Sequence, residues 1–175
     1  MEPKSWTISD FMTPVVCCAD VELTLADARD RMTANKIRHL LITRGPMVVG
    51  VLSQRDIDVA DASARKRETP TIADAMHTDV FTCTVDSSLE DVAAVMEEKK
   101  IGCTIVRDDN KAVGIFTTTD ALRAVRSLIN GKKVDALSPP THVVAHDEIG
   151  PIARHDVRVS DSVRAASGMI GSVGL

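Results

Sequence analysis

Apolar and polar positions in the first half of the chain follow a definite order of patterns. Apolar residues recur at helical spacing after a capping pattern at Thr24, and two apolar runs then flank a turn that contains Gly45 and Pro46. Pro14 should stop a short helical turn near the start. The patterns predict, in chain order, a helical turn at 8–12, an extended run at 15–21, a helix at 25–35, strands at 39–43 and 47–52, and a helix at 53–62.

The second half repeats this order at a constant offset of 64 residues, so that Ile8 matches Ile72 and Gly50 matches Gly114. It predicts a turn at 72–76, an extended run at 80–85, helices at 89–99 and 117–130, and strands at 103–107 and 112–116. One copy of this length would be only marginally stable alone, so we expect the two copies to close one core. The expected class is α+β, with two tandem β-α-β-β-α repeats and an irregular C-terminal extension.

The expected boundaries follow from the composition of the connecting stretches. The stretch before Pro70 is charged and reads as a linker, whereas the C-terminal part is rich in proline and glycine and loses the pattern. The expected parts are a first repeat at 7–62, a linker at 63–70, a second repeat at 71–130 and an extension of unknown role at 131–175. Within the extension we expect one strand near 157–159 and a short helix after Ser160 or Ser162.

The composition of the chain argues against several classes of function. A formal net charge of −4 argues against a general binder of nucleic acid or of anionic membranes, and 44% hydrophobic residues in 175 can form a real core. No apolar stretch is long enough for a signal peptide or a membrane span, so we expect a cytoplasmic protein. The cysteines lack metal-site spacing and lie in apolar runs, so buried thiols are expected, although a redox role for the vicinal pair Cys17 and Cys18 is an alternative.

Each predicted hairpin ends in the motif Gly-apolar-apolar-(Ser/Thr)-x-x-Asp. Ser53 and Thr117 would stand at helix N-termini, where free backbone N–H groups favour an anion, and Asp56 and Asp120 would follow one turn later. A phosphate suits the first position and a ribose diol suits the second. The same residues also form an ordinary capping pattern, in which the aspartate only accepts from the backbone of its own N-cap.

The duplicated pattern resembles a pair of cystathionine β-synthase (CBS) domains, the Bateman module. The resemblance covers about residues 7 to 127, and it rests on the order of loose motifs that occurs twice. The matching pieces are 10–14 (DFMTP), 36–41 (KIRHLL) and 49–56 (VGVLSQRD), then 100–102 (KIG), 113–117 (VGIFT) and Asp120.

The resemblance implies a regulatory module whose repeats pack through their sheets and leave two clefts for adenine nucleotides. The first cleft would use Thr13, Val15, Val16, Arg38, His39, Ser53, Arg55 and Asp56. The second would use His77, Asp79, Val80, Gly102, Cys103, Thr117 and Asp120. Because the first set is richer in cations, it should hold a phosphate better. Arg38 could instead lie along the surface, and His39 could be an ordinary half-buried imidazole.

The expected function is non-catalytic binding of an AMP-, ADP- or ATP-like nucleotide, with occupancy signalled to a protein partner. No P-loop, dinucleotide fingerprint or catalytic set occurs in the sequence, and no cofactor or metal is expected to be required. The resemblance also implies a homodimer. The alternative is a ligand-free interaction scaffold that acts through the tail or linker. A third possibility is a metal or redox sensor in the tail, built on His142, His146 and His155.

Overall fold

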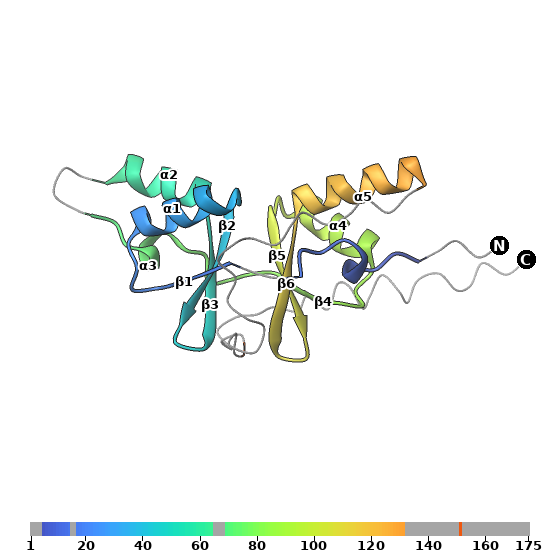
Figure 1. The fold of residues 1–175 in the computed structure, drawn as a ribbon, viewed down its shortest axis with the longest axis horizontal. Helices are drawn as coiled ribbons and strands as arrows, with labels where there is room; N and C mark the ends of the chain where they lie inside the picture. Colours follow the sequence, from blue (N-terminus) through green and yellow to red (C-terminus); the bar gives the residue numbers. More distant parts are fainter. Residues whose placement is uncertain (1–4, 15–16, 65–68, 132–150, 152–175) are drawn as a thin grey trace, which may run out of the picture.

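A computed structural model describes residues 5–14, 17–64, 69–131 and 151 (Figure 1). The first part contains a short 3-10 helix η1 (Ile8–Asp10), β1 (Cys18–Asp20), α1 (Leu25–Asn35), β2 (His39–Arg44), β3 (Met47–Ser53) and α2 (Gln54–Ser63). The second contains α3 (Ile72–Ala75), β4 (Thr82–Thr84), α4 (Leu89–Glu98), β5 (Cys103–Asp108), β6 (Lys111–Thr117) and α5 (Thr118–Asn130). The order of elements repeats as the sequence predicts. The predicted strand and helix after residue 151 lie outside the described residues, as do Val15 and Val16.

Each repeat forms a three-stranded sheet with the same topology. β1 runs parallel to β2, which pairs antiparallel with β3, and the second sheet repeats this in β4, β5 and β6. Both hairpins carry an irregularity at matching places, between Ile42 and Thr43 and between Val106 and Arg107. Capping boxes begin four of the α-helices, α1, α2, α3 and α5, and satisfy backbone N–H groups where these helices start.

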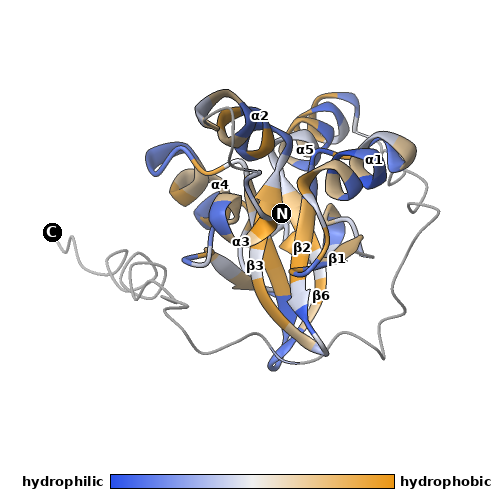
Figure 2. Ribbon diagram, turned by 90° about the vertical axis from the view of Figure 1, so that its left-hand side faces the viewer, coloured by the Kyte–Doolittle hydropathy of each residue, from blue (hydrophilic) through white to orange (hydrophobic). Residues whose placement is uncertain are grey.

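The two repeats lie side by side and pack through their sheets, with the helices on the outer faces (Figure 1). A shared apolar cluster joins Cys18, Leu41 and Val51 of the first repeat to Cys103 and Ile105 of the second. Figure 2 shows the hydrophobic colouring concentrated on the strands between the helices. The predicted α+β fold of two repeats that pack through their sheets is therefore confirmed. The expected single core is corrected, because each repeat has a core of its own beside the shared cluster. Cys17 and Cys18 point to opposite faces of the sheet, since they belong to different apolar clusters.

The segments that lead into the two repeats are exchanged. We call residues 5–14 the first leading segment and residues 71–80 the second. Ile8 and Phe11 of the first lie in the core of the second repeat, whereas Ile72 of the second lies in the core of the first repeat. In Figure 1 the dark blue first segment accordingly lies beside α4 and β6, and the green α3 lies beside α1 and α2.

Two glycines allow this exchange. A Cβ on Gly50 would lie 2.6 Å from the backbone oxygen of His77, and a Cβ on Gly114 would lie 2.6 Å from that of Thr13. Each leading segment crosses a strand of the other repeat at this point, and the bonds from His77 N to Val51 O and from Val51 N to His77 O are both 2.9 Å. Only glycine lets the two backbones approach so closely.

Candidate functional site

The N-terminus of α2 is built by a reciprocal pair of contacts between Ser53 and Asp56. Asp56 Oδ2 accepts from Ser53 N at 2.8 Å and from Ser53 Oγ at 2.6 Å, while Asp56 N donates to Ser53 Oγ at 3.2 Å. The capping alternative for this motif is therefore real. It uses only one carboxylate oxygen, so the other remains for a second role.

That second oxygen faces the leading segment of the other repeat. Asp56 Oδ1 lies 3.1 Å from His77 Nε2, and the His77 side chain is 71% exposed whereas that of Asp56 is 17% exposed. Burial acts to raise the pKa of Asp56, but hydrogen bonds from Ser53 and His77 outweigh it, and the net pKa is lowered. Asp56 is thus an ionised acceptor at neutral pH, and its neighbour is an exposed side chain that can move aside.

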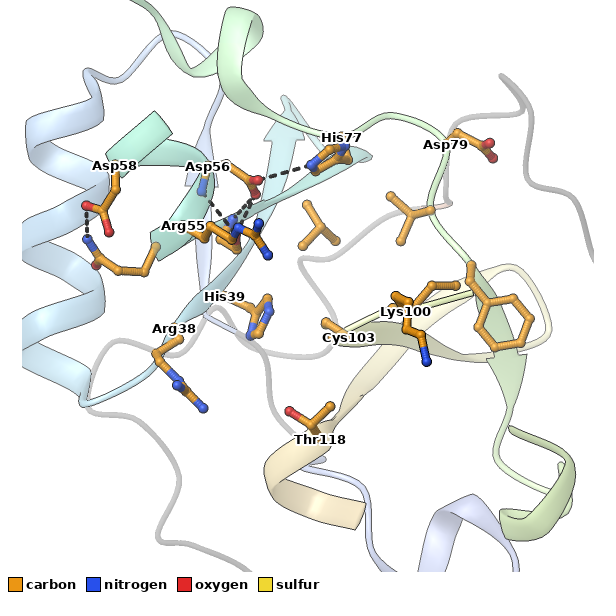
Figure 3. Close-up of a pocket in the computed structure, with 17 residues that line it drawn as sticks. Arg38, His39, Arg55, Asp56, Asp58, His77, Asp79, Lys100, Cys103 and Thr118 are labelled. Carbon is orange, nitrogen blue, oxygen red and sulfur yellow. Dashed lines mark hydrogen bonds and ion pairs between the residues drawn. The ribbon is translucent and has the colours of Figure 1, made fainter. Parts of the chain in front are cut away.

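A cavity of about 750 Å³ opens beside Asp56, between the two repeats (Figure 3). It is lined by Arg38, His39, Val51, Ser53, Gln54, Arg55, Asp56, Asp58, His77, Asp79, Val80, Phe81, Lys100, Ile101, Gly102, Cys103 and Thr118. In Figure 3 Asp56 and His77 point toward one another on one side, and Lys100 and Thr118 lie across the cavity on the second repeat. The cavity therefore combines three carboxylates, Asp56, Asp58 and Asp79, with the cations Arg38, Arg55 and Lys100 and with apolar side chains.

His39 lies half-buried inside this cavity. Burial lowers its pKa, the Arg38 charge lowers it further, and the charges of Asp56 and Asp120 act in the opposite direction with a smaller effect. The imidazole is therefore neutral at pH 7. Arg38 and Arg55 are exposed at the cavity, so their side chains can contact an anionic group of a ligand without a large desolvation cost.

The matching position in the second repeat is closed. Asp120 Oδ2 accepts from Thr117 N at 2.8 Å and from Thr117 Oγ1 at 2.7 Å, as in the first repeat. Its Oδ1, however, accepts from Arg123 Nη1 at 2.7 Å and from Thr13 Oγ1 at 3.1 Å. The side chains of Asp120 and Arg123 are only 2% and 7% exposed.

The structure corrects the grouping of the predicted site residues. We expected Thr13 to lie with Arg38 and Asp56, and His77 with Thr117 and Asp120. Because the leading segments are exchanged, Thr13 instead contacts Asp120, and His77 contacts Asp56. Ten predicted residues share the cavity: Arg38, His39, Ser53, Arg55, Asp56, His77, Asp79, Val80, Gly102 and Cys103. Thr13, Thr117 and Asp120 form the closed arrangement, and a nucleotide-binding role for each of these residues stays a prediction.

Sequence reasoning missed Lys100, Thr118 and Arg123. Lys100 stands two residues before the predicted Gly102, and Arg123 stands one helical turn after Asp120, where the first repeat has Val59. The offset of 64 residues makes that contrast visible, although it does not show that Arg123 turns inward.

The cysteines have low nucleophilicity. Burial raises the pKa of Cys18 and of Cys103 to about 12 and that of Cys83 to about 11. Because the thiolate is the reactive form, these thiols favour packing over redox chemistry. No group of three or more His, Cys, Asp or Glu side chains among the described residues could hold a metal ion, and the tail histidines lie outside that part. No described helix is long and apolar enough to cross a membrane.

Comparison with known proteins gives a consistent result. The sequence model of the CBS domain matches residues 8–62 and 72–127. A protein from Vibrio cholerae described as an acetoin utilization protein (AcuB) is 30% identical, with a TM-score of 0.64 over 73% of this chain and 95% of that one. The CBS domain pair of protein MJ0100, solved with 5′-methylthioadenosine and S-adenosyl-L-methionine, is 25% identical, with a TM-score of 0.63 over 73% and 98%. CBSX2, solved with AMP, is 26% identical, with a TM-score of 0.62 over 71% and 98%.

The curated relatives are longer than this chain. An uncharacterized protein of Methanocaldococcus jannaschii is 33% identical over 108 residues, which are 58% of this chain and 34% of that protein. The chain spans about a third or less of the length of the curated relatives it matches.

Proposed function

This chain belongs to the CBS domain family, and from that premise we propose that it is a non-catalytic regulatory module that binds an adenine nucleotide between its two repeats. The observation that carries the proposal is Asp56 Oδ1, which takes no part in the helix cap and contacts only the exposed His77 side chain among the described residues, inside a cavity that also presents cations. A ribose diol needs a paired acceptor, and a phosphate needs donors and positive charge. The cavity offers both, next to the apolar side chains of Val80 and Ile101.

The proposed binding mode follows from the positions of these groups. Asp56 accepts from the ribose hydroxyls after His77 moves aside. Arg38, His39 and Arg55 surround the phosphate, with Ser53 at the N-terminus of α2, where the helix dipole favours an anion. The adenine rests against the apolar wall. Related structures contain AMP, S-adenosyl-L-methionine or 5′-methylthioadenosine, which supports an adenosine-containing ligand without deciding the number of phosphates.

Signalling would arise because the cavity draws its walls from both repeats. α2 contributes Asp56, while the second repeat contributes His77, Lys100 and Thr118. A ligand that bridges these groups stabilises the arrangement of repeats in which they converge, and it can shift only states that it binds unequally. A protein effector that recognises this arrangement would then sense occupancy.

We also propose that the module self-associates through α5. This helix exposes four large apolar side chains, Leu122, Val125, Leu128 and Ile129, and the last is 78% exposed. The matching positions on α2 include Asp58 and Asp61, which pair with Arg29 instead. A second copy is the occupant proposed, since an apolar stripe on one helix is complementary to itself about a twofold axis.

The nucleotide proposal is tested by a thermal-shift and calorimetry panel of AMP, ADP, ATP, S-adenosyl-L-methionine and 5′-methylthioadenosine. A ligand at about 100 times its Kd should stabilise the fold by about 2.7 kcal/mol. For a chain of this size that is a rise in Tm of about 5 to 11 °C.

The matched variants are Asp56→Asn and Asp27→Asn. Each replaces the carboxylate of a capping box, Asp56 on α2 and Asp27 on α1, but only Asp56 lines the cavity. We expect Asp56→Asn to lose the shift and Asp27→Asn to keep it. A flat panel for the wild-type chain, freed of any co-purified nucleotide, would reject the sensor and favour the ligand-free scaffold.

A further inference from the structure

We propose that Arg123 closes the nucleotide position of the second repeat, so that each chain binds one adenine nucleotide, at Asp56. The inference rests on the proposed function and adds to it the number of sites and the residue that sets this number. In both repeats Oδ2 of the aspartate, Asp56 or Asp120, accepts from the residue that caps the helix. The two repeats differ in the side chains that contact Oδ1 of this aspartate.

Two pairs of matching residues carry the difference. Thr13 and His77 occupy equivalent places, and each contacts the carboxylate of the other repeat. His77 is at the surface, whereas Thr13 is partly buried. Arg123 and Val59 also match: Val59 is 56% exposed and points away from the core, but Arg123 is buried and donates to Asp120 Oδ1 at 2.7 Å.

A ribose cannot easily displace Arg123. Its hydroxyls are neutral donors, so they would replace an ion pair by hydrogen bonds in which only the acceptor is charged, and they would leave the buried Arg123 charge without its partner. Arg123 Nη1 also lies 3.3 Å from the backbone oxygen of Phe11, which ties the first leading segment to α5. A ligand at Asp120 would therefore have to break contacts that also hold the fold together.

The remaining nitrogen of Arg123 does not provide a ligand site of its own. Nη2 is buried and has no hydrogen-bond partner among the described residues. Because the atom has no exposed surface, a phosphate cannot reach it while the Arg123–Asp120 pair is intact. Both bonds of the guanidinium to described residues run through Nη1, to Asp120 and to the Phe11 carbonyl. Replacing this one side chain would therefore leave Asp120 Oδ1 with only the Thr13 hydroxyl as its partner in the described part of the chain.

The first experiment measures binding stoichiometry by calorimetry, with AMP and, separately, 5′-methylthioadenosine as probes. We expect one site per wild-type chain and none in Asp56→Asn. Two sites in the wild type would overturn the inference and leave the proposed function standing. One remaining site in Asp56→Asn would overturn the inference and the proposed role of Asp56. No binding of either probe to the wild type would overturn both.

The second experiment opens the closed position. Arg123→Met keeps most of the apolar stem of the side chain and removes the donor. We expect two sites in Arg123→Met and one in the double variant Asp56→Asn with Arg123→Met. If a folded Arg123→Met binds only one nucleotide, Arg123 does not close the site. Should circular dichroism show that Arg123→Met is unfolded, the stoichiometries of the wild type and Asp56→Asn decide the inference alone.

Discussion

His77 Nε2 lies 3.1 Å from Asp56 Oδ1, although the two residues belong to different repeats. This contact completes the cavity because it brings the second leading segment to the N-terminus of α2. It also keeps the carboxylate partnered until a ligand takes the place of the imidazole.

Removing the His77 imidazole should raise the pKa of Asp56. The hydrogen bond and charge of His77 are among the causes that lower it, so in His77→Ala the carboxyl should titrate at a higher pH than in the wild type. Carbon-detected NMR of the side-chain carboxyl across pH 2 to 6 measures this, with exposed Asp58 as the internal control. An unchanged Asp56 titration would mean that the contact is absent in solution.

Stability should depend on pH through His39. Its pKa is lowered in the folded chain, so between that pKa and the ordinary value of about 6.5 the unfolded chain binds more protons. The free energy of unfolding should therefore rise with pH through this window and gain nothing more from His39 above it. His39→Gln should flatten part of this slope in urea unfolding at pH 5.5, 6.5 and 7.5. Equal slopes for the two proteins would contradict the burial of the imidazole.

Loss of cavity cations should affect phosphate-bearing ligands alone. Arg38→Ala and Arg55→Ala should each weaken AMP by about 1 kcal/mol, or about fivefold in Kd, because both side chains are exposed and their contacts are screened. Neither should change the affinity for 5′-methylthioadenosine. Arg44→Ala, at the exposed end of β2 outside the cavity lining, is the control of equal charge. Parallel losses for both ligands would place these arginines near the nucleoside instead.

The two crossing-point glycines should tolerate no side chain. Gly50→Ala and Gly114→Ala place a methyl group against a backbone oxygen that cannot move without breaking hydrogen bonds. We expect a loss of about 1–3 kcal/mol and a fall in Tm of about 2–12 °C. Gly102→Ala is the control, since its Cβ would lie 3.6 Å from His39 Nε2, an ordinary contact. An unchanged Tm for both crossing variants would refute the close approach.

The α5 stripe should control the oligomeric state. The wild-type chain should have the mass of a dimer in light scattering, and Leu122→Glu with Ile129→Glu should yield a folded monomer. The control Val59→Glu changes an exposed apolar residue on α2 and should remain dimeric. A monomeric wild-type chain at tens of micromolar would remove the basis for self-association.

Much of the fold was predictable because the same sequence pattern occurs twice. A pattern such as Ser53 to Asp56 has several meanings alone, but its recurrence at Thr117 to Asp120 gives the position of a helix start after a strand. Seven of the ten predicted residues in the cavity lie at strand ends and helix starts that the pattern locates, whereas His77, Asp79 and Val80 reach it through the exchanged leading segment.

The exchange of leading segments was not predictable in this way. Both strands carry the necessary glycine, Gly50 and Gly114, so a segment could cross its own repeat or the other one with the same local chemistry. Only the packing of Ile8, Phe11 and Ile72 decides between these arrangements, and such packing depends on the whole fold. The buried position of the Arg123 side chain was not predictable either, because the start of a helix does not determine which way a long side chain points.

The exchange also makes the two repeats mutually dependent for folding. Ile8 and Phe11 complete the core of the second repeat, and Ile72 completes that of the first. Neither repeat has a complete core without the other. The two repeats should therefore unfold in a single cooperative transition and not as two independent domains. A chain cleaved between the repeats would yield two fragments, each of which carries the leading segment that completes the core of the other. The fragments would regain native cores only by reassociation.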